Sequence, residues 1–401
     1  MFATRTSPWR VRNENLEMPK KTRSVTNRNG AVTPSVGSAV SLADAKRRLD
    51  VLIRKTRDVF YKPMAVAEIL YRNRTEHLNL AAKDEYRRSS DRWSKDVARM
   101  LWNTATSSNS RYWDQMFDEP LMTPATLTAL GAANRSSAFP GLVETYIYAH
   151  LNDKLQGIRQ ILDWISEQTA SEFQLMDLIA KFVNDHRYVQ SVDKLYEVVV
   201  YALFEVVIQR LDAKVSLTIN PNSIILKTFD DFAFMVLGVN AANPCIEHPA
   251  RLYRVGKANA SDGGLDMWAN FGPAVQVKHV SLSMDGCSDI CEKIYADKII
   301  IVCKDAAAEV VNAVLTQVGL GERIRGVIRE SDLCRWYLEA CNMPKDRNLG
   351  RDLLEVLVRE MGHEFSTSQD DALDRMTDFS TRRGYRYDAL PNDWNALWSG
   401  A

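Results

Sequence analysis

The sequence lacks an excess of charge of either sign. Its 51 Lys and Arg residues balance 51 Asp and Glu residues, so the formal net charge is zero. Bulk basicity therefore gives no indication of nucleic-acid binding, although a local basic cleft is compatible with a neutral total.

Long apolar runs are also absent. No stretch approaches the ~18 residues that a membrane-spanning helix needs, and the N-terminus has no continuous apolar segment typical of a secretory signal. We therefore expect no membrane association and a cytoplasmic location.

Cysteine is scarce and scattered. The six cysteines lie at positions 245, 287, 291, 303, 334 and 341. Cys287 and Cys291 are the one close pair, and no second pair or matching histidines follow them. A zinc site is not expected, and free thiols in a reducing compartment are the simpler interpretation.

The first 41 residues, 1–41, differ in composition from the rest. They are rich in Arg, Asn, Ser, Thr and Gly and show little apolar periodicity. Seven Lys or Arg residues stand against two Glu residues, a net charge of +5, which leaves the remainder at −5. This composition is typical of a disordered basic tail.

From Leu42 the pattern becomes helical. Ser41 stands where an N-cap is expected, and apolar residues recur at spacings of three and four. Pro63 interrupts the pattern, and a second helix is expected to follow it. The remaining helices of this region are expected at 85–102, 124–133, 142–165 and 173–183. Residues 42–185 are therefore predicted to form a helical N-terminal domain.

Residues 192–210 are almost wholly apolar, which favours a buried helix; their many β-branched residues keep a strand as the alternative. After Asn220-Pro221-Asn222, short apolar runs alternate with turns and short helices. Strands are expected at 223–226, 251–255, 264–270, 274–281, 298–303 and 326–329, and helices at 285–295, 306–318 and 331–340.

The most informative segment runs from Asp262 to Lys278. It reads DGGLD, then MWANFGPAV, then QVK, and is interpreted as a β-hairpin. Residues two apart on a strand share a face, so Gln276 and Lys278 point the same way. Asp266 joins them only if the hairpin loop has an odd number of residues or a bulge intervenes.

This combination of side chains suits metal-assisted hydrolysis of a phosphodiester. Mg²⁺ prefers a few protein oxygens together with waters and the substrate phosphate. Asp266 would supply a charged ligand, Gln276 a carbonyl oxygen and Val277 its backbone carbonyl. Lys278 would hold or deprotonate the attacking water and offset negative charge in the transition state.

A further carboxylate would compensate for the neutral glutamine. We assign it to Glu197, an acid within the apolar run 192–208, where an unpaired charge is costly unless it has a role. An Asp followed by QxK also occurs by chance, and the alternative is a surface hairpin with a solvated Lys and Gln. Gly263 and Gly264, which allow close approach before the acid, and a downstream strand that completes an αβββαβ order favour the catalytic interpretation.

The segment resembles the PD-(D/E)xK nuclease signature in its QxK form, with DGGLD as the glycine-acid version. ADAKRRLDVLIRKTRDVFYKPMAVAEILYRNRT and KLYEVVVYALF also resemble the HaeII-type restriction endonucleases, and the similarity runs from about Leu42 into the 330s. The resemblance assigns the catalytic set to Asp266, Gln276 and Lys278. Gln276 departs from the commoner acid of the signature.

The resemblance implies a bacterial type II enzyme that cuts both DNA strands within a short GC-rich palindrome. It also implies a homodimer that matches the two-fold symmetry of the site, with a cognate DNA methyltransferase as functional partner. The expected fold is α+β: a helical N-terminal region, then a restriction-endonuclease-like αβββαβ core with a mixed central sheet. The core is placed at 186–345 and a C-terminal helical segment at 346–401.

Several neighbouring residues have weaker alternatives. Asp262 could replace Asp266 as metal ligand, and His279 is expected to pack on the opposite face of the strand. Ser281 and Ser283 could contact a phosphate, although a strand end is the simpler interpretation. The DNA contacts expected in the segment 381–387 are Arg382, Arg383 and Arg386.

Two other functions compete with site-specific cleavage. One is a nuclease of the same fold that attacks modified or branched DNA. The other is a DNA-binding or scaffolding protein with an inactive core. Divalent-metal-dependent cutting of unmodified plasmid into discrete bands would support site-specific cleavage over both of these alternatives.

Overall fold

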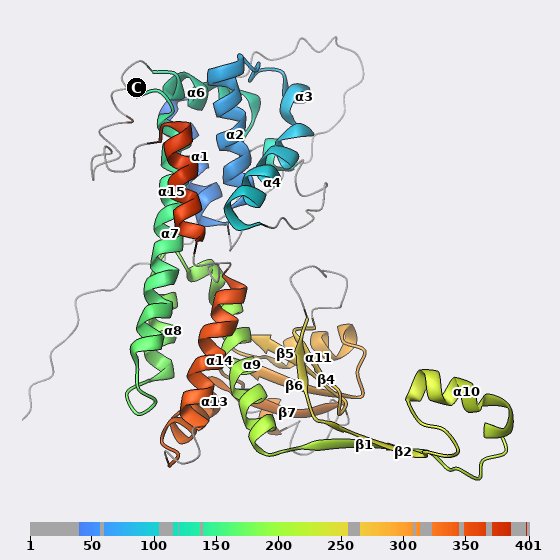
Figure 1. Ribbon diagram of the computed structural model, residues 1–401. Coiled ribbons are helices and arrows are strands. Elements are labelled where there is room, and N and C mark those ends of the chain that lie inside the picture. The colour runs from blue at the N-terminus through green and yellow to red at the C-terminus, as the bar shows by residue number, and fades with distance from the viewer. Residues whose placement is uncertain are drawn as a thin grey trace, which may run out of the picture. The chain divides into compact units, whose positions relative to one another are not determined.

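The structure is a computed structural model, shown in Figure 1. It describes residues 40–56, 60–103, 115–118, 120–136, 139–255, 265–307, 310–312, 323–344, 349–365, 371–385 and 398. The predicted tail at 1–41 lies outside the described residues except for its last two positions.

Helices dominate the first half of the chain. They are α1 (Leu42–Arg54), α2 (Tyr61–Glu76), α3 (Lys83–Tyr86), α4 (Ser89–Trp102), α6 (Pro124–Asn134), α7 (Leu142–Glu167), α8 (Leu175–Val183) and α9 (Val192–Arg210), with short 3₁₀ turns at Gln115–Phe117 and Val189–Ser191. Ser41 caps α1 as predicted, since its hydroxyl accepts a hydrogen bond from the Asp44 amide. Pro63 does not precede the second helix; it lies in the first turn of α2, where a missing N–H costs nothing.

The helices α1, α2, α4, α6 and the first half of α7 enclose one apolar cluster. The C-terminal helix α15 (Ala372–Arg383) joins it through buried Met376 and Phe379. Arg383 at the end of α15 pairs with buried Glu68 of α2 at 3.1 Å and lies over the ring of Tyr71. Side chains near the C-terminus therefore complete a core that begins near residue 45.

Glu144 of α7 is the most buried acid of this cluster. Its carboxylate is fully shielded and accepts hydrogen bonds from Arg74, Asn134 and Tyr385. Replacing Glu144 by Ala removes the acceptor of two buried side chains and the partner of the half-buried Arg74 guanidinium. We therefore expect a loss of about 3–5 kcal/mol in the free energy of unfolding. Urea denaturation measures this loss. Glu76→Ala is the control, because Glu76 forms an exposed ion pair with Arg72 and its replacement is expected to cost at most about 1 kcal/mol.

The 26-residue helix α7 contributes to two clusters. Val143 to Leu155 face the first, whereas Ile158 to Ile165 face a second cluster that also contains α8, α9 and two later helices, α13 (Glu330–Cys341) and α14 (Leu349–Glu364). Gly157 lies between the two sets. A β-carbon there would come within 1.9 Å of the Tyr188 hydroxyl, so the close approach of that ring requires glycine.

Five of the described strands form one mixed sheet. Its strands are β3 (Leu252–Arg254), β4 (Met267–Ala269), β5 (Pro273–Lys278), β6 (Lys298–Cys303) and β7 (Ile324–Arg329), in that spatial order. The β3–β4–β5 pairs are antiparallel and the β5–β6–β7 pairs are parallel. With α9 before β3 and α11 (Met284–Lys293) between β5 and β6, the chain has the predicted αβββαβ order, followed by β7.

Helices cover both faces of the sheet. Alternate residues of β5, Val275 and Val277, pack in the second cluster with α9, α13 and α14. Ala274 packs on the other face in a third cluster, with Ile299 and Ile301 of β6 and with α11. The alternation follows from the two-residue period of a strand, and the α+β architecture agrees with a restriction-endonuclease-like core.

Between α9 and β3 the chain forms a segment that the sequence patterns missed. We call residues 214–249 the arm: strands β1 (Lys214–Thr218) and β2 (Cys245–Pro249) pair antiparallel, and helix α10 (Leu226–Leu237) lies between them in the chain. The predicted strand at 223–226 is wrong, because 223–225 form a turn and Leu226 begins α10.

Most other boundaries agree with the prediction within a few residues. The helix at 192–210 and the strand at 298–303 have the predicted bounds. Of the helix expected at 306–318, residues 310–312 are helical and 313–322 lie outside the described residues. The division into parts at 42–185, 186–345 and 346–401 stays a prediction. None of the described helices is both long and apolar enough to cross a membrane.

Candidate functional site

The β4–β5 hairpin meets the geometric condition set by the sequence. Met267 pairs with Val275 and Trp268 with Ala274, and three loop residues, Asn270 to Gly272, join the strands. Gly272 has φ 112°, in the left-handed region that favours glycine. An odd loop puts the residue before β4, Asp266, opposite Gln276.

The Asp266 carboxylate lies where β4 begins. Its Oδ2 accepts one hydrogen bond from the Gln276 amide Nε2 at 2.5 Å and another from the Val277 backbone N–H at 2.7 Å. The carboxylate thus accepts the hydrogen bond from Val277 that a backbone carbonyl of a neighbouring strand would otherwise accept. Among the described residues, its Oδ1 receives no hydrogen bond, so one oxygen stays available to a ligand.

Lys278 ends β5, two residues after Gln276, and is half-buried. Burial raises the pKa of Asp266, while the Val277 N–H and the positive charge of Lys278 act in the opposite direction. The ammonium of Lys278 therefore acts electrostatically on the Asp266 carboxylate. The structure brings Asp266, Gln276, Val277 and Lys278 together; their catalytic roles stay a prediction.

Glu197 lies on α9, which packs on the sheet. Both of its oxygens accept hydrogen bonds from the ammonium of Lys194, at 2.8 and 2.9 Å. Burial raises the pKa of Glu197 to about 7; Lys194 lowers it, and the negative charge of Asp266 raises it further. Glu197 is thus within electrostatic reach of Asp266, although no hydrogen bond joins the two carboxylates.

A largely buried arginine of β3 borders this site. Arg254 pairs with Glu364 at 2.5 Å, with Glu360 at 3.2 Å and with Glu197 at 3.8 Å. It links the candidate ligand Glu197 to α14, which carries Glu360 and Glu364.

Sequence reasoning missed four members of this arrangement: Lys194, Arg254, Glu360 and Glu364. Lys194 stands one helical turn before Glu197, a spacing that brings side chains together and could have identified it. The two glutamates on α14 are more than 100 residues from Arg254 in sequence, so no local signal predicts that contact.

The donor set fits a hard cation. No group of three or more His, Cys, Asp or Glu among the described residues is arranged to hold a metal ion. The predicted site has two carboxylates, Asp266 and Glu197, and would add the Gln276 amide oxygen and the Val277 carbonyl. Mg²⁺ keeps several waters and uses only one or two carboxylates, so this set of oxygens is sufficient.

The remaining sequence candidates have simpler positions. His279 is exposed beyond the end of β5, so its predicted packing role is wrong. Ser283 caps α11, since its hydroxyl accepts from the Gly286 amide. Asp262 and Arg386 lie outside the described residues. The pairing of Arg383 with Glu68 commits that guanidinium to the helical core, whereas Arg382 is exposed in the last turn of α15.

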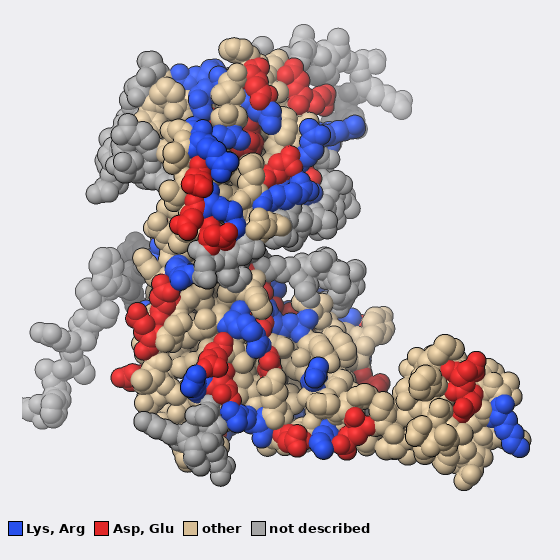
Figure 2. All heavy atoms as spheres, in the orientation of Figure 1, with Lys and Arg blue, Asp and Glu red and all other residues tan. Residues whose placement is uncertain are grey.

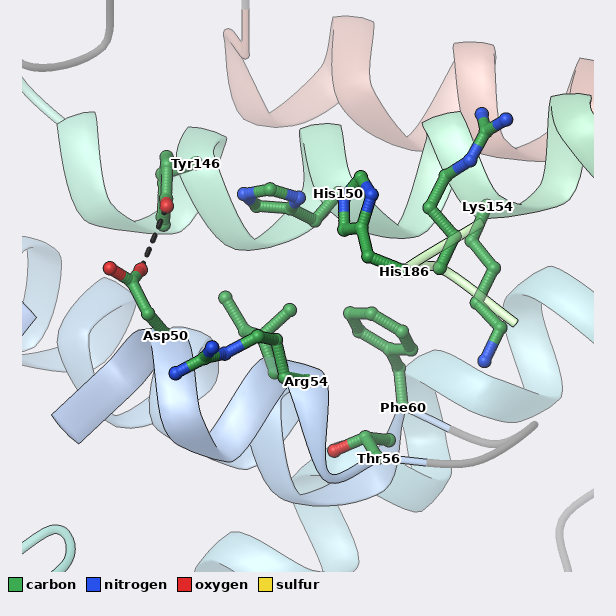
Figure 3. A pocket seen from close by; sticks show the side chains of 10 residues that line it. Asp50, Arg54, Thr56, Phe60, Tyr146, His150, Lys154 and His186 are labelled. Atoms are coloured by element: carbon green, nitrogen blue, oxygen red, sulfur yellow. Dashed lines mark hydrogen bonds between the residues drawn. The ribbon is translucent and has the colours of Figure 1, made fainter. Parts of the chain in front are cut away.

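A separate pocket lies among α1, α7 and the turn after α8 (Figure 3). Its volume is about 360 Å³, and its polar lining includes Asp50, Arg54, His150, Lys154 and His186. Within it, the Tyr146 hydroxyl donates to Asp50 at 2.8 Å, and burial lowers the pKa of His150. None of the predicted catalytic residues lines this pocket, so it is distinct from the candidate site.

Comparison with known proteins identifies the chain's relatives. The family described as HaeII restriction endonuclease matches residues 45–385. The chain is 36% identical over 323 residues to the type II restriction enzyme HaeII of Haemophilus aegyptius, covering 80% of this chain and 91% of that enzyme. It is also 36% identical over 343 residues to the type II restriction enzyme NgoBI of Neisseria gonorrhoeae, covering 85% and 96%. No solved structure matches.

These matches confirm the resemblance to the HaeII-type restriction endonucleases and extend it beyond the 330s into α14 and α15. Type II restriction endonucleases generally need a divalent metal ion, which agrees with the oxygen-rich donor set beside Lys278. The chain belongs to the HaeII restriction endonuclease family.

Proposed function

We propose that this protein is a Mg²⁺-dependent type II restriction endonuclease that cleaves double-stranded DNA within a short GC-rich palindrome. The observation that carries the proposal is the contact of Asp266 with both Gln276 and Val277, the two residues directly before Lys278. It supports a compact set of oxygen donors and one ammonium in a chain of this family.

Each side chain has a proposed role. The hydrogen bonds from Gln276 and Val277 orient the Asp266 carboxylate and leave Oδ1 for a ligand. Lys278 would hold the attacking water or take its proton, and would offset the charge that builds up on the phosphate. Arg254 would keep Glu197 beside the site, and Lys194 would hold its carboxylate while no metal is bound.

The proposed ligands of a Mg²⁺ ion are Asp266, Gln276, the backbone carbonyl of Val277, and Glu197. Bound there, the ion would neutralise part of the charge on the scissile phosphate. Metal binding by Glu197 competes with its bond to Lys194, so the ammonium of Lys194 would have to give way.

The proposed assembly is a homodimer, because two copies related by a two-fold axis match a palindrome and can cut both strands. A cognate DNA methyltransferase that protects the host sites is the proposed functional partner, and the bacterial cytoplasm the proposed location. Of the two proposed DNA contacts that the structure describes, exposed Arg382 is better placed, since Glu68 already holds Arg383.

Digestion of unmodified plasmid tests the proposal. In Mg²⁺ we expect discrete bands with 5′-phosphate ends, and none in EDTA. Cutting restricted to methylated or branched DNA would support the alternative nuclease, and metal-independent binding without cutting would support an inactive DNA-binding protein.

Asp266→Asn isolates the role of the carboxylate. The amide has nearly the same shape but no charge, so we expect Mg²⁺-dependent cleavage to fall by roughly 10²-fold or more while the fold is retained. Plasmid cleavage and urea denaturation measure the two effects. Asp297→Asn, at an exposed acid just before β6, is the matched control and is expected to cut at the normal rate. A fully active Asp266→Asn enzyme would contradict the assignment.

A further inference from the structure

The arm, residues 214–249, has almost no interior of its own. Its strands β1 and β2 form a two-stranded ribbon, and α10 closes the end of that ribbon (Figure 1). Only Ala233 and Val239 of the arm are buried. A two-stranded ribbon is marginally stable in water by itself, so the arm needs further packing to be stable.

Helix α10 and the turn before it expose large apolar side chains. Eight are more than two-fifths exposed: Ile224, Ile225, Phe229, Phe232, Phe234, Met235, Val236 and Leu237. Phe232, Met235 and Val236 follow a three- and four-residue spacing along one face, whereas Phe234 and Leu237 lie on another. A helix that is apolar on more than one face is normally buried, and patches of this size mark interaction sites.

The charge of the arm argues against a nucleic-acid partner. Its two lysines face three acids, Asp230, Asp231 and Glu247, for a net charge of −1 with His248 neutral. Lys214 is moreover paired with Glu247 at 3.1 Å. Figure 2 shows the arm as mostly uncharged surface. Phosphate binding needs clustered Lys and Arg, so the surface fits an apolar protein surface.

We propose that the arm is the interface between two copies of this chain, with α10 of one copy packed against α10 of the other. A segment without its own core needs a partner that is always present in equal amount, and a second copy meets that requirement. At ~100 Å² each, these eight side chains offer on the order of 800 Å² per copy, the size of a standard stable interface, when the partner covers both apolar faces of α10. The inference rests on the proposed homodimer and names its surface.

The test measures the mass of the full-length protein by analytical ultracentrifugation. We expect a dimer for the wild type and a monomer at micromolar concentration for the double variant Phe232→Asp, Met235→Asp, with at least ~100-fold weaker dimerisation because charges cannot be buried unpaired. Tyr295→Asp, at a side chain that is 97% exposed outside the arm, is the matched control and stays dimeric. Both variants are expected to stay folded, since the arm adds little to the core. Circular dichroism checks that each variant keeps the helix content of the wild type.

Cross-linking identifies the contact itself. With Val236→Cys in a Cys245→Ser background, a short bismaleimide is expected to join residue 236 of one copy to residue 236 of the other, as mass spectrometry of mixed ¹⁴N and ¹⁵N protein reports. A monomeric wild type, a dimer that the double variant leaves intact, or cross-links from 236 to another segment overturns the inference. A wild-type monomer that cuts plasmid overturns the interface alone, whereas a dimer that does not cut overturns the proposed cleavage alone.

Discussion

Lys278→Ala is expected to abolish DNA cleavage while DNA binding persists. Lys278 stands two residues after Gln276 on β5, and its charge acts on the Asp266 carboxylate. Loss of a group that moves a proton and offsets developing charge costs roughly 10²- to 10⁴-fold in rate. Single-turnover cleavage of a plasmid measures the rate, and electrophoretic mobility of the same DNA without metal measures binding.

Binding is expected to survive because one ammonium is a small part of the total contact of a protein with DNA phosphates. Lys293→Ala is the matched control, since Lys293 is an exposed lysine of α11 whose ion pair with Asp289 contributes little. Lys278→Arg keeps the charge but moves a proton poorly, so a partial rate would separate the two roles of Lys278. Normal cutting by Lys278→Ala would leave the catalytic assignment without its central residue.

Arg254→Met is expected to destabilise the fold strongly, by about as much as Glu144→Ala. The guanidinium is largely buried and contacts Glu197, Glu360 and Glu364. Without it, these carboxylates remain in a buried site, and breaking a buried ion network typically costs about 3–5 kcal/mol. Arg351→Met is the control on α14, because Arg351 has an exposed pair with Glu355 and should cost well under ~1 kcal/mol.

The loss of unfolding free energy caused by Arg254→Met is expected to depend on pH. The pKa of Glu197, about 7, exceeds the unfolded value near 4.5, so the folded protein holds a proton that the unfolded chain releases. Raising the pH through this window therefore destabilises the fold, and removing the nearby cation strengthens the effect. Urea denaturation at pH 8 and pH 5.5 is expected to show the larger deficit at pH 8. An equal loss of stability at both pH values would mean that the charge of Arg254 does not affect the ionisation of Glu197.

Local patterns predicted much of the sheet region. The helix 192–210 and the strand 298–303 are continuous apolar runs buried on more than one side, so their sequence matches their environment. The hairpin was predictable because the parity of its loop fixes which residues face each other across two strands. The adjacency of Asp266 and Gln276 follows from that parity.

The arm and the Arg254 network were not predictable in the same way. Apolar sequence normally predicts a buried element, but the apolar residues of α10 are exposed. The apolar run at 223–226 was therefore interpreted as a strand, although Leu226 begins α10. Arg254 lies on an otherwise apolar short strand, and Glu360 and Glu364 come from a helix far along the chain. Only tertiary packing brings these three charges together.

The continuity of α7 has a consequence for how members of this family can diverge. This one continuous helix contributes side chains to the cluster of the N-terminal helices and to the second cluster, which packs on the sheet. A shift of α7 along its axis, or a rotation, would move both sets of side chains at once. Exchange of the N-terminal helices between relatives therefore has to carry with it part of the packing around the five-stranded sheet.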